Sequence, residues 1–350
     1  MSEAHDGVEI VPVREAHRLD EAALARHLTT HLDGFEGPLR VSQFEGGQSN
    51  PTYLLQTPGC QYVMRKKPPG ELLPSAHAVD REYRVMTALA ETDVPVPETL
   101  LFVEDESIVG TPFFIMQRVA GRVLVDPLLP GLSAADRRAL YDHFAEVLAA
   151  LHTVDHEAVG LGDFGRPGSY YARQIGRWTK QYRASETEDI PAMDRLIEWL
   201  PENVPESDTV SIVHGDYRIG NCIVHPTEPR IVAVLDWELS TLGHPLADLS
   251  YACMGYHADL GHIESFIGID FEATGIPTEA AFVARYCAAT GREEIENWSF
   301  YVAFSLFRIA AIVQGVYKRG LDGIASSERA IGFKDDCRLR AEQAWELVRD

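Results

Sequence analysis

Short apolar runs alternate with turn residues in the first third of the chain, and this spacing predicts strands. Segments rich in Gly and Pro separate the runs, so the first three strands form an antiparallel meander. A segment whose apolar residues share a helical face, residues 79–90, interrupts the series. An earlier helix is expected where leucine recurs at every fourth position, with Asp20 placed to cap it. The expected strands are residues 39–44, 53–56, 61–65, 99–103 and 113–119.

The pattern changes to a helical period after a connection rich in Pro and Gly at residues 121–131. Ser133 precedes an apolar stripe and can cap the first of these helices, with Asp136 three residues further on. The most apolar helical segment is residues 298–317, which we expect at the centre of the core. The other expected helices are residues 170–183, 191–200, 246–256 and 279–290. We therefore predict an α+β chain with an antiparallel-sheet N-terminal lobe, residues 1–119, and a mainly helical C-terminal lobe, residues 120–350.

Charge and size narrow the functional class. The chain of 350 residues has 45% apolar residues, enough to bury a substantial core. It carries 31 Lys and Arg residues against 53 Asp and Glu residues, which gives a net charge of -22. A general nucleic-acid binder needs a concentrated positive surface, so we expect no nucleic-acid partner.

The cysteines and the apolar runs indicate the cellular compartment. Five cysteines form no Cys-x-x-Cys pair, so the sequence predicts neither a disulfide framework nor a Cys-rich zinc site. The first residues lack a basic stretch followed by an apolar core, and no uninterrupted apolar run approaches about 18 residues. We therefore expect a soluble, cytoplasmic protein with no membrane partner.

A polar loop between two apolar runs carries the clearest chemical pattern. It reads Ile-Val-His-Gly-Asp-Tyr-Arg-Ile-Gly-Asn over residues 212–221, and a second apolar run ends at Asp236. Strand ends and a hairpin would bring Asp216, Asn221 and Asp236 to a common edge. In phosphoryl transfer one Asp accepts the hydroxyl proton, while an Asn and another Asp hold magnesium against the phosphates. A loop Asp that only caps its own backbone would not explain the other two residues.

On the His-Gly-Asp sequence, the Asn five residues later and the strand that ends in Asp-Trp, the chain resembles the aminoglycoside phosphotransferase family. It resembles most closely the kinase-like domain of some acyl-CoA dehydrogenases. The resemblance implies a two-lobed, protein-kinase-like fold that uses ATP and Mg²⁺ to phosphorylate a hydroxyl of a small molecule. It assigns Asp216 as the catalytic base, Asn221 and Asp236 as metal ligands, and residues 1–119 as the nucleotide-binding lobe.

The first expected hairpin holds a candidate phosphate loop, Gly46-Gly47-Gln48-Ser49-Asn50. Small residues such as Gly46 and Gly47 let backbone amides approach a polyphosphate, although a Gly-Gly pair in a hairpin is often only a turn. The resemblance implies that Ser49 and Asn50 donate hydrogen bonds to the phosphates.

A nucleotide also needs a fixed cation, and Arg65 ends the third strand where kinases usually carry Lys. Glu82, on the following helix, is the expected ion partner. Lys66 and Lys67 adjoin Arg65, so which cation reaches the phosphates stays open. The segment that joins the lobes offers the backbone of Gln117 and Val119 to adenine, although a plain buried strand has the same pattern.

Other residues around the loop are also assigned candidate roles. Arg218 is a candidate to neutralise charge on the transferred group, and Glu238 could bind a second ion or remain an exposed acid. We interpret His214 as a loop-bracing residue and not as a base, because kinase-type loops use the neighbouring Asp for proton transfer. The His and Cys residues near it are an incomplete set for a structural zinc site. Asp248 is expected to begin a helix and to brace the loop through backbone hydrogen bonds.

The acceptor is the least determined part. Resemblance to the dehydrogenase-linked kinases suggests a hydroxyacyl-CoA or hydroxy acid, and a functional link to an acyl-CoA dehydrogenase. A cationic aminoglycoside or choline-like alcohol is the alternative, because the acidic surface would attract it. A non-catalytic nucleotide-binding partner of an acyl-CoA dehydrogenase is the third interpretation.

Overall fold

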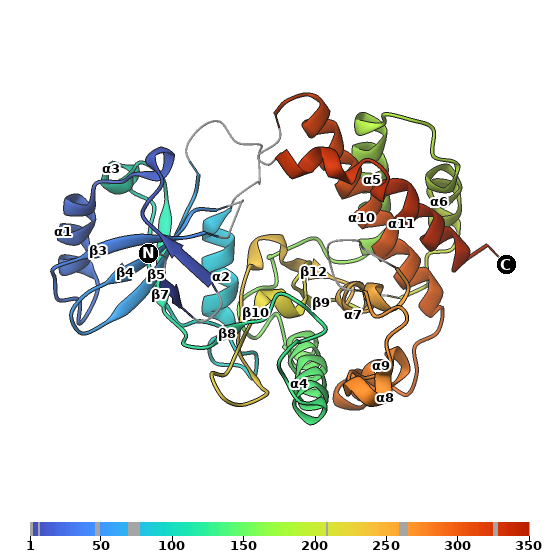
Figure 1. Cartoon of the computed structure of the whole chain (residues 1–350), viewed down its shortest axis with the longest axis horizontal. Helices are drawn as coiled ribbons and strands as arrows, with labels where there is room; N and C mark the ends of the chain where they lie inside the picture. Colours follow the sequence, from blue (N-terminus) through green and yellow to red (C-terminus); the bar gives the residue numbers. More distant parts are fainter. Residues whose placement is uncertain are drawn as a thin grey trace. The chain divides into compact units, whose positions relative to one another are not determined.

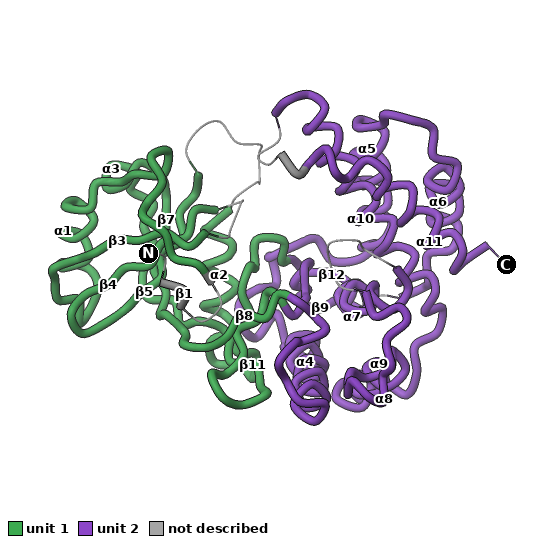
Figure 2. The backbone as a smooth tube through the Cα atoms, in the orientation of Figure 1, with its two compact units in different colours: residues 1–125, 220–240 green, residues 126–219, 241–350 purple. Residues whose placement is uncertain are grey.

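The chain divides into two compact units in the computed structural model (Figure 2). Unit 1 contains residues 1–125 and 220–240, and unit 2 contains residues 126–219 and 241–350. Unit 1 thus combines the first 125 residues with a hairpin from the second half of the chain. The division into a nucleotide-binding lobe, residues 1–119, and a catalytic lobe, residues 120–350, stays a prediction. The structure describes residues 3–5, 8–45, 50–68, 78–207, 209–258, 265–324 and 328–349.

Unit 1 is built on a seven-stranded sheet in which each described pair of neighbours is antiparallel. The meander and the inserted helix expected from the sequence are present. The sheet has the order β1-β2-β3-β4-β5-β7-β6. Its strands are β1 (Glu3–His5), β2 (Val8–Val11), β3 (Arg40–Phe44), β4 (Thr52–Gln56), β5 (Gln61–Lys66), β6 (Thr99–Val103) and β7 (Phe113–Gln117).

The prediction of five strands was wrong for this sheet, because β1 and β2 add a hairpin before the first helix. Strand β2 joins the sheet by pairing Ile10 with Phe44 and Val11 with Gln43 of β3. These strands are only three and four residues long, so they are too short to show a clear apolar alternation. Their pairing partner, not their own pattern, makes them strands.

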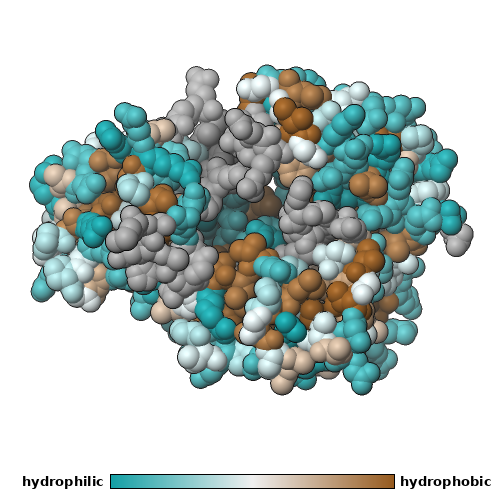
Figure 3. All heavy atoms as spheres, viewed as in Figure 1, coloured by the Kyte–Doolittle hydropathy of each residue, from teal (hydrophilic) through white to brown (hydrophobic). Residues whose placement is uncertain are grey.

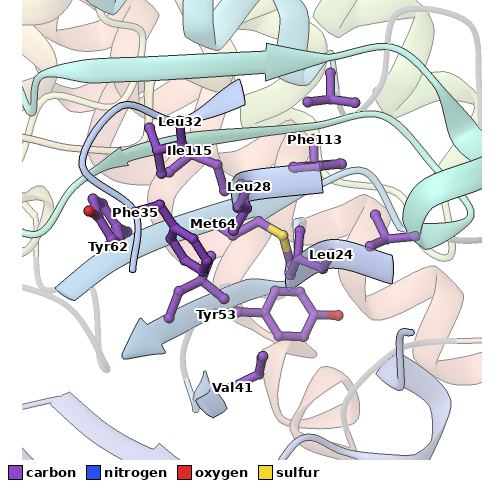
Figure 4. Packing of buried hydrophobic residues seen from close by; sticks show 13 residues of the cluster. Leu24, Leu28, Leu32, Phe35, Val41, Tyr53, Tyr62, Met64, Phe113 and Ile115 are labelled. Carbon is purple, nitrogen blue, oxygen red and sulfur yellow. The ribbon is translucent and has the colours of Figure 1, made fainter. Parts of the chain in front are cut away.

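Helix α1 (Glu21–His31) covers one face of the sheet (Figure 1). Asp20 caps it by accepting a hydrogen bond from the Ala23 amide at 2.8 Å, as its position predicts. Leu24 and Leu28 are fully buried and pack with alternate residues of the strands, such as Tyr53 and Met64 (Figure 4). The apolar residues that recur at every fourth position in the helix and at every second position in the strands therefore form one core.

The other face of the sheet packs against α2 (Val79–Leu89). Tyr83 of this helix lies with its ring centroid 6.0 Å from that of Phe114, a residue of β7. Glu82 on the same helix is buried, so the helix delivers one carboxyl to the interior of the unit. A short helix, α3 (Glu106–Val109), connects β6 to β7.

Residues 220–240 form a hairpin within unit 1. Strand β10 (Cys222–Val224) pairs with β11 (Ile231–Val234) and with the two-residue strand β8 (Arg122–Val123). The hairpin is also joined to the rest of the unit by a hydrogen bond from the Val234 amide to the Pro95 carbonyl at 2.8 Å.

Unit 2 is mainly helical, and its helices agree closely with the sequence expectations. Ser133 caps α4 by accepting a hydrogen bond from the Asp136 amide at 3.1 Å. A two-stranded sheet joins β9 (Ser211–Val213) to β12 (Thr241–Gly243). The helices are α4 (Ala134–Thr153), α5 (Tyr170–Ser185), α6 (Pro191–Glu202), α7 (Leu246–Ala252), α8 (Phe271–Thr274), α9 (Glu279–Thr290), α10 (Trp298–Leu321) and α11 (Asp336–Glu346).

Helix α10 is the centre of unit 2, as its apolar sequence predicts, and it contacts α5, α7 and α11. Among the described residues it is the one helix long and apolar enough to cross a membrane, with a mean hydropathy of 1.5 in its most apolar window. That window is 72% buried within the protein, which is the position of a core helix. Hydrophilic residues cover much of the surface in the view of Figure 3.

Candidate active site

The His-Gly-Asp loop follows β9, and a single buried carboxylate holds its backbone. Asp248 in the first turn of α7 accepts hydrogen bonds from the amides of His214, at 2.5 Å, and Gly215, at 2.8 Å. Gly215 has a φ of 85°, a backbone conformation that residues with a Cβ rarely adopt. The prediction that Asp248 begins a helix and braces the loop is confirmed.

Asp248 is itself held by a residue from a second helix. Its side chain is 1% exposed, and its Oδ2 lies 3.4 Å from Nε2 of His152 at the end of α4. Burial alone would raise the pKa of this carboxyl, but the hydrogen bonds and the charges of His152 and His214 hold the pKa below its usual range. Asp248 therefore remains an ionised acceptor for the two loop amides.

The Asp216 carboxylate has partners on both oxygens. Its Oδ1 accepts a hydrogen bond from the Tyr251 hydroxyl at 2.5 Å, and its Oδ2 lies 3.4 Å from Nε of Arg218. The Asp216 amide donates to Nδ1 of His214 at 3.2 Å, so His214 braces the loop as predicted. Arg308 of α10 donates from Nη2 to the Gly215 carbonyl at 2.6 Å.

In unit 1, Arg65 lies among three acids. Its Nε is 2.8 Å from Oε2 of Glu82, the ion partner expected from the sequence. Its Nη2 is 2.6 Å from Oδ1 of Asp236 and 3.6 Å from Oε2 of Glu238. Because residues next to each other on a strand point to opposite faces, Lys66 points away from this cluster. Arg65 is therefore the cation that pairs with these acids, and Lys66 is not.

The charges in this cluster are strongly coupled. Burial raises the pKa of Glu82 to about 7, with Asp236 and Glu238 adding to the rise and Arg65 opposing it. Burial lowers the pKa of the Arg65 guanidinium, but the three acids outweigh burial and raise it. One guanidinium thus faces three carboxyls, so a divalent cation would relieve the excess of negative charge.

The two predicted metal ligands lie at one end of the β10–β11 hairpin. The Leu235 amide, next to Asp236, donates to the Asn221 carbonyl at 2.8 Å. Asp236 has a left-handed φ of 67°, and the buried Trp237 indole anchors the turn by donating to the Val234 carbonyl at 2.9 Å. The Asp236 side chain is 34% exposed, which leaves its carboxylate accessible.

The donor set near Asp236 fits a magnesium ion. Asn50 is fully buried and donates from Nδ2 to Oε2 of Glu238 at 3.3 Å, while its Oδ1 has no hydrogen-bond partner among the described residues. Mg²⁺ prefers oxygen ligands and is often held by one or two side chains together with substrate phosphates. Within the described ranges no three His, Cys, Asp or Glu residues form a metal site by themselves, so the phosphates would complete the ligand set.

The remaining nucleotide-binding predictions are only partly described. Gly46, Gly47 and Ser49 lie outside the described residues. Gln117 ends β7, and its amide donates to the Glu98 carbonyl at 2.8 Å; Val119 follows the strand. Their contacts with a nucleotide, and the roles of the other predicted site residues, stay predictions.

Two residues at the loop were missed from the sequence. Tyr251 lies three positions after Asp248 on α7, so a helical spacing could have placed it beside the loop. Arg308 lies in the middle of the most apolar helix, where a buried charge signals a specific partner.

A family model for the phosphotransferase enzyme family matches residues 40–301 of the chain. Acyl-CoA dehydrogenase family member 10 of Mus musculus is 47% identical over 340 residues, which cover 96% of this chain and 32% of that protein. Acyl-CoA dehydrogenase family member 11 of Homo sapiens is 42% identical over 348 residues, which cover 98% of this chain and 44% of that protein. The chain spans less than half the length of these two relatives.

Solved structures show the same fold. One from Ralstonia eutropha, assigned as an aminoglycoside phosphotransferase, is 54% identical with a TM-score of 0.88, over 95% of this chain and 99% of that chain. Spectinomycin phosphotransferase, solved with ADP and spectinomycin, is 13% identical with a TM-score of 0.63, over 95% of this chain and 99% of that chain. These matches confirm the predicted protein-kinase-like α+β fold.

Replacing Asp248 with Asn should destabilise unit 2 by about 2–4 kcal/mol at pH 7, because an amide cannot accept from both loop amides as a carboxylate does. The low pKa of Asp248 stabilises the fold above pH of about 4, and this stabilisation is lost as the pH falls through the folded pKa. The difference from wild type should therefore shrink as the pH is lowered from 7 to 3.

Urea unfolding curves at several pH values measure this difference. The exposed Asp189, replaced with Asn, is the matched control and should stay within about 0.5 kcal/mol of wild type. Equal stability of the Asp248 and Asp189 variants at pH 7 would contradict the bracing role.

Proposed function

The chain belongs to the phosphotransferase enzyme family, and we propose that it transfers the γ-phosphoryl group of ATP to the hydroxyl of an anionic small molecule. A hydroxy acid or a hydroxyacyl-CoA is the acceptor class that the site favours. The observation that carries the proposal is the braced Asp216, whose backbone amide and carboxylate are both fixed by hydrogen bonds. A carboxylate fixed in this way suits a reaction that depends on positioning more than on base strength.

The residues proposed to hold the nucleotide and metal belong to unit 1. Arg65, kept in place by Glu82, would contact the phosphates, with the hairpin loop around Gly46, Gly47 and Ser49 covering them. Asn221 and Asp236 would hold Mg²⁺, and the ion supplies charge neutralisation on the phosphates when it is bound. Arg65 now pairs with Asp236, so phosphate and metal would each replace one half of this ion pair.

In the proposed reaction the acceptor oxygen forms the new P–O bond while the bond between the γ-phosphorus and the ADP oxygen breaks. The acceptor hydroxyl loses its proton to the Asp216 carboxylate, and ADP leaves with the electron pair of the broken bond. Arg218, whose Nε lies 3.4 Å from Asp216, would offset the negative charge that develops on the transferred group.

A basic stretch in unit 2 favours an anionic acceptor. Residues 164–185 contain no Asp or Glu, whereas the whole chain has a net charge of -22. The stretch carries five cations, Arg166, Arg173, Arg177, Lys180 and Arg183. Most of these residues lie on α5, which packs on α10. The Arg177 guanidinium lies 5.2 Å from the Trp178 ring centroid, and Arg308 lies 5.7 Å from the same ring. Because Arg308 also binds the Gly215 carbonyl, the basic helix adjoins the loop that carries the base.

A cationic alcohol such as an aminoglycoside or a choline-like compound is the second candidate, since the net charge of -22 would attract it over long range. The local cations at α5 and Arg308 oppose it. We also propose a functional link to an acyl-CoA dehydrogenase. The support is that two relatives are named as members of the acyl-CoA dehydrogenase family, although this chain covers less than half of their length.

Replacing Asp216 with Asn should reduce magnesium-dependent phosphoryl transfer at least about a hundredfold, because the amide accepts no proton. ATP affinity should stay within about twofold of wild type, since the proposed nucleotide contacts lie in unit 1. Turnover is followed with labelled ATP and binding by calorimetry. Wild-type turnover in the Asp216→Asn variant would overturn the proposed function.

Replacing Arg218 with Ala should lower kcat about tenfold to a thousandfold and leave the ATP affinity nearly unchanged, because the residue is proposed to act on developing charge. Turnover with labelled ATP measures kcat, and calorimetry measures the ATP affinity. Unchanged kcat would remove Arg218 from the mechanism.

Replacing Arg177 and Lys180 together with Glu should raise the KM of an anionic acceptor about tenfold or more, while the KM of ATP stays constant. A control with the same change in charge replaces the exposed Arg26 and Lys334 with Glu. A cationic acceptor would instead bind the Arg177 and Lys180 variant more tightly, and its affinity for wild type would fall with added salt.

A further inference from the structure

We propose that Tyr251 is the positioning residue that orients the Asp216 carboxylate for proton transfer, and that Arg308 fixes Tyr251 and the loop together. This inference rests on the proposed function, because it gives Tyr251 a role only if Asp216 is the base. It concerns unit 2 alone, since all of these residues belong to that unit.

The contact between Tyr251 and Asp216 is short and directional. The phenol donates to Oδ1 of Asp216 at 2.5 Å, a length typical of a hydrogen bond from O–H to a carboxylate. Burial raises the pKa of the Tyr251 phenol well above its ordinary value, and the adjacent Asp216 carboxylate raises it further. The phenol therefore keeps its proton and remains a donor at every pH at which such an enzyme works.

Helix α7 fixes the loop at two points through residues one turn apart. Asp248 binds the amides of His214 and Gly215, and Tyr251, three positions later, binds the Asp216 side chain. Residues at this spacing lie on one face of a helix. The same helical face therefore sets both the backbone and the carboxylate of the proposed base.

Arg308 connects this arrangement to α10. Its guanidinium carbon lies 5.3 Å from the Tyr251 ring centroid and 5.7 Å from that of Trp178, distances typical of cation–π contacts. Its Nη2 donates to the Gly215 carbonyl at 2.6 Å, and the residue is 8% exposed. A planar guanidinium can stack on a ring and donate in its own plane at the same time, which an ammonium cannot do.

The chemical consequence is a restricted carboxylate. With Oδ1 bound to the phenol, rotation of the Asp216 side chain is limited, and the carboxylate keeps one orientation toward an acceptor hydroxyl. A loose transition state gains most from such positioning, and a displacement of about 1 Å can cost about a hundredfold in rate. Tyr251 thus affects the rate of transfer and not the binding of ATP.

The test replaces Tyr251 with Phe, which removes the hydroxyl and keeps the ring under Arg308. We expect kcat to fall about tenfold to a hundredfold with the KM of ATP within about twofold of wild type. The matched control is Tyr256→Phe, which removes another largely buried hydroxyl, one that donates to the Pro277 carbonyl at 2.9 Å. This control should keep wild-type kcat.

Turnover is measured with ATP and 3-hydroxybutyryl-CoA, and ATP hydrolysis with water as the acceptor gives a readout that does not depend on the acceptor. Urea unfolding of both variants separates a loss of positioning from a loss of stability. Arg308→Lys is a second variant, which keeps the charge and should lower kcat without raising the KM of ATP.

The inference is overturned if Tyr251→Phe keeps kcat within about twofold of wild type, or if both Tyr variants lose kcat in proportion to their loss of stability. Asp216→Asn is measured beside them. If that variant is inactive while Tyr251→Phe is fully active, the inference fails and the proposed function stands. If Asp216→Asn is fully active, the proposed function fails first.

Discussion

The candidate active site depends on one residue, Gly215, whose two flanking peptide groups are both held by buried charges. Asp248 accepts from the Gly215 amide, and Arg308 donates to the Gly215 carbonyl, so α7 and α10 fix the loop between them. Both charged side chains are buried and would be costly there without these partners. Because the peptide groups on both sides of Gly215 are held, the Asp216 side chain leaves the backbone at a fixed point. The loop sequence provides the reactive groups, and the buried charges of α7 and α10 fix their positions.

Unit 1 uses the same physics for another purpose. Arg65 from β5, Glu82 from α2 and Asp236 after β11 come from distant parts of the chain and meet in a largely buried cluster. A buried ion pair contributes little net stability, but it fixes side chains in one arrangement. The surplus of carboxyls, with a pKa of about 7 at Glu82, marks a site that would gain from a bound cation. The two clusters thus divide the proposed work, one for phosphate and metal and the other for the acceptor hydroxyl.

Sequence patterns predicted the elements with strong local signals and missed those defined by tertiary contacts. The Asp20 and Ser133 caps and the leucine period located their helices within a few residues. Helix α11 was missed because its buried residues are three small ones, Cys337, Ala341 and Ala344, together with the charged Arg340, and these give a weak apolar period. At the site, Asp248 was predicted from its position in the family pattern, whereas Arg308 lies 93 positions from Gly215, and no local rule connects them.

The central claim is that this chain moves a phosphoryl group from ATP to a hydroxyl of an anionic small molecule. The most direct measurement is a phosphorus NMR time course of the protein with ATP and Mg²⁺, run with hydroxy acids, hydroxyacyl-CoAs, amino alcohols and aminoglycosides in turn. The account predicts that the γ-phosphate signal decays while a phosphomonoester signal grows with a hydroxy acid or a hydroxyacyl-CoA. Tight binding of ATP with no phosphomonoester from any of these alcohols would contradict it, and would favour a nucleotide-binding partner without catalysis.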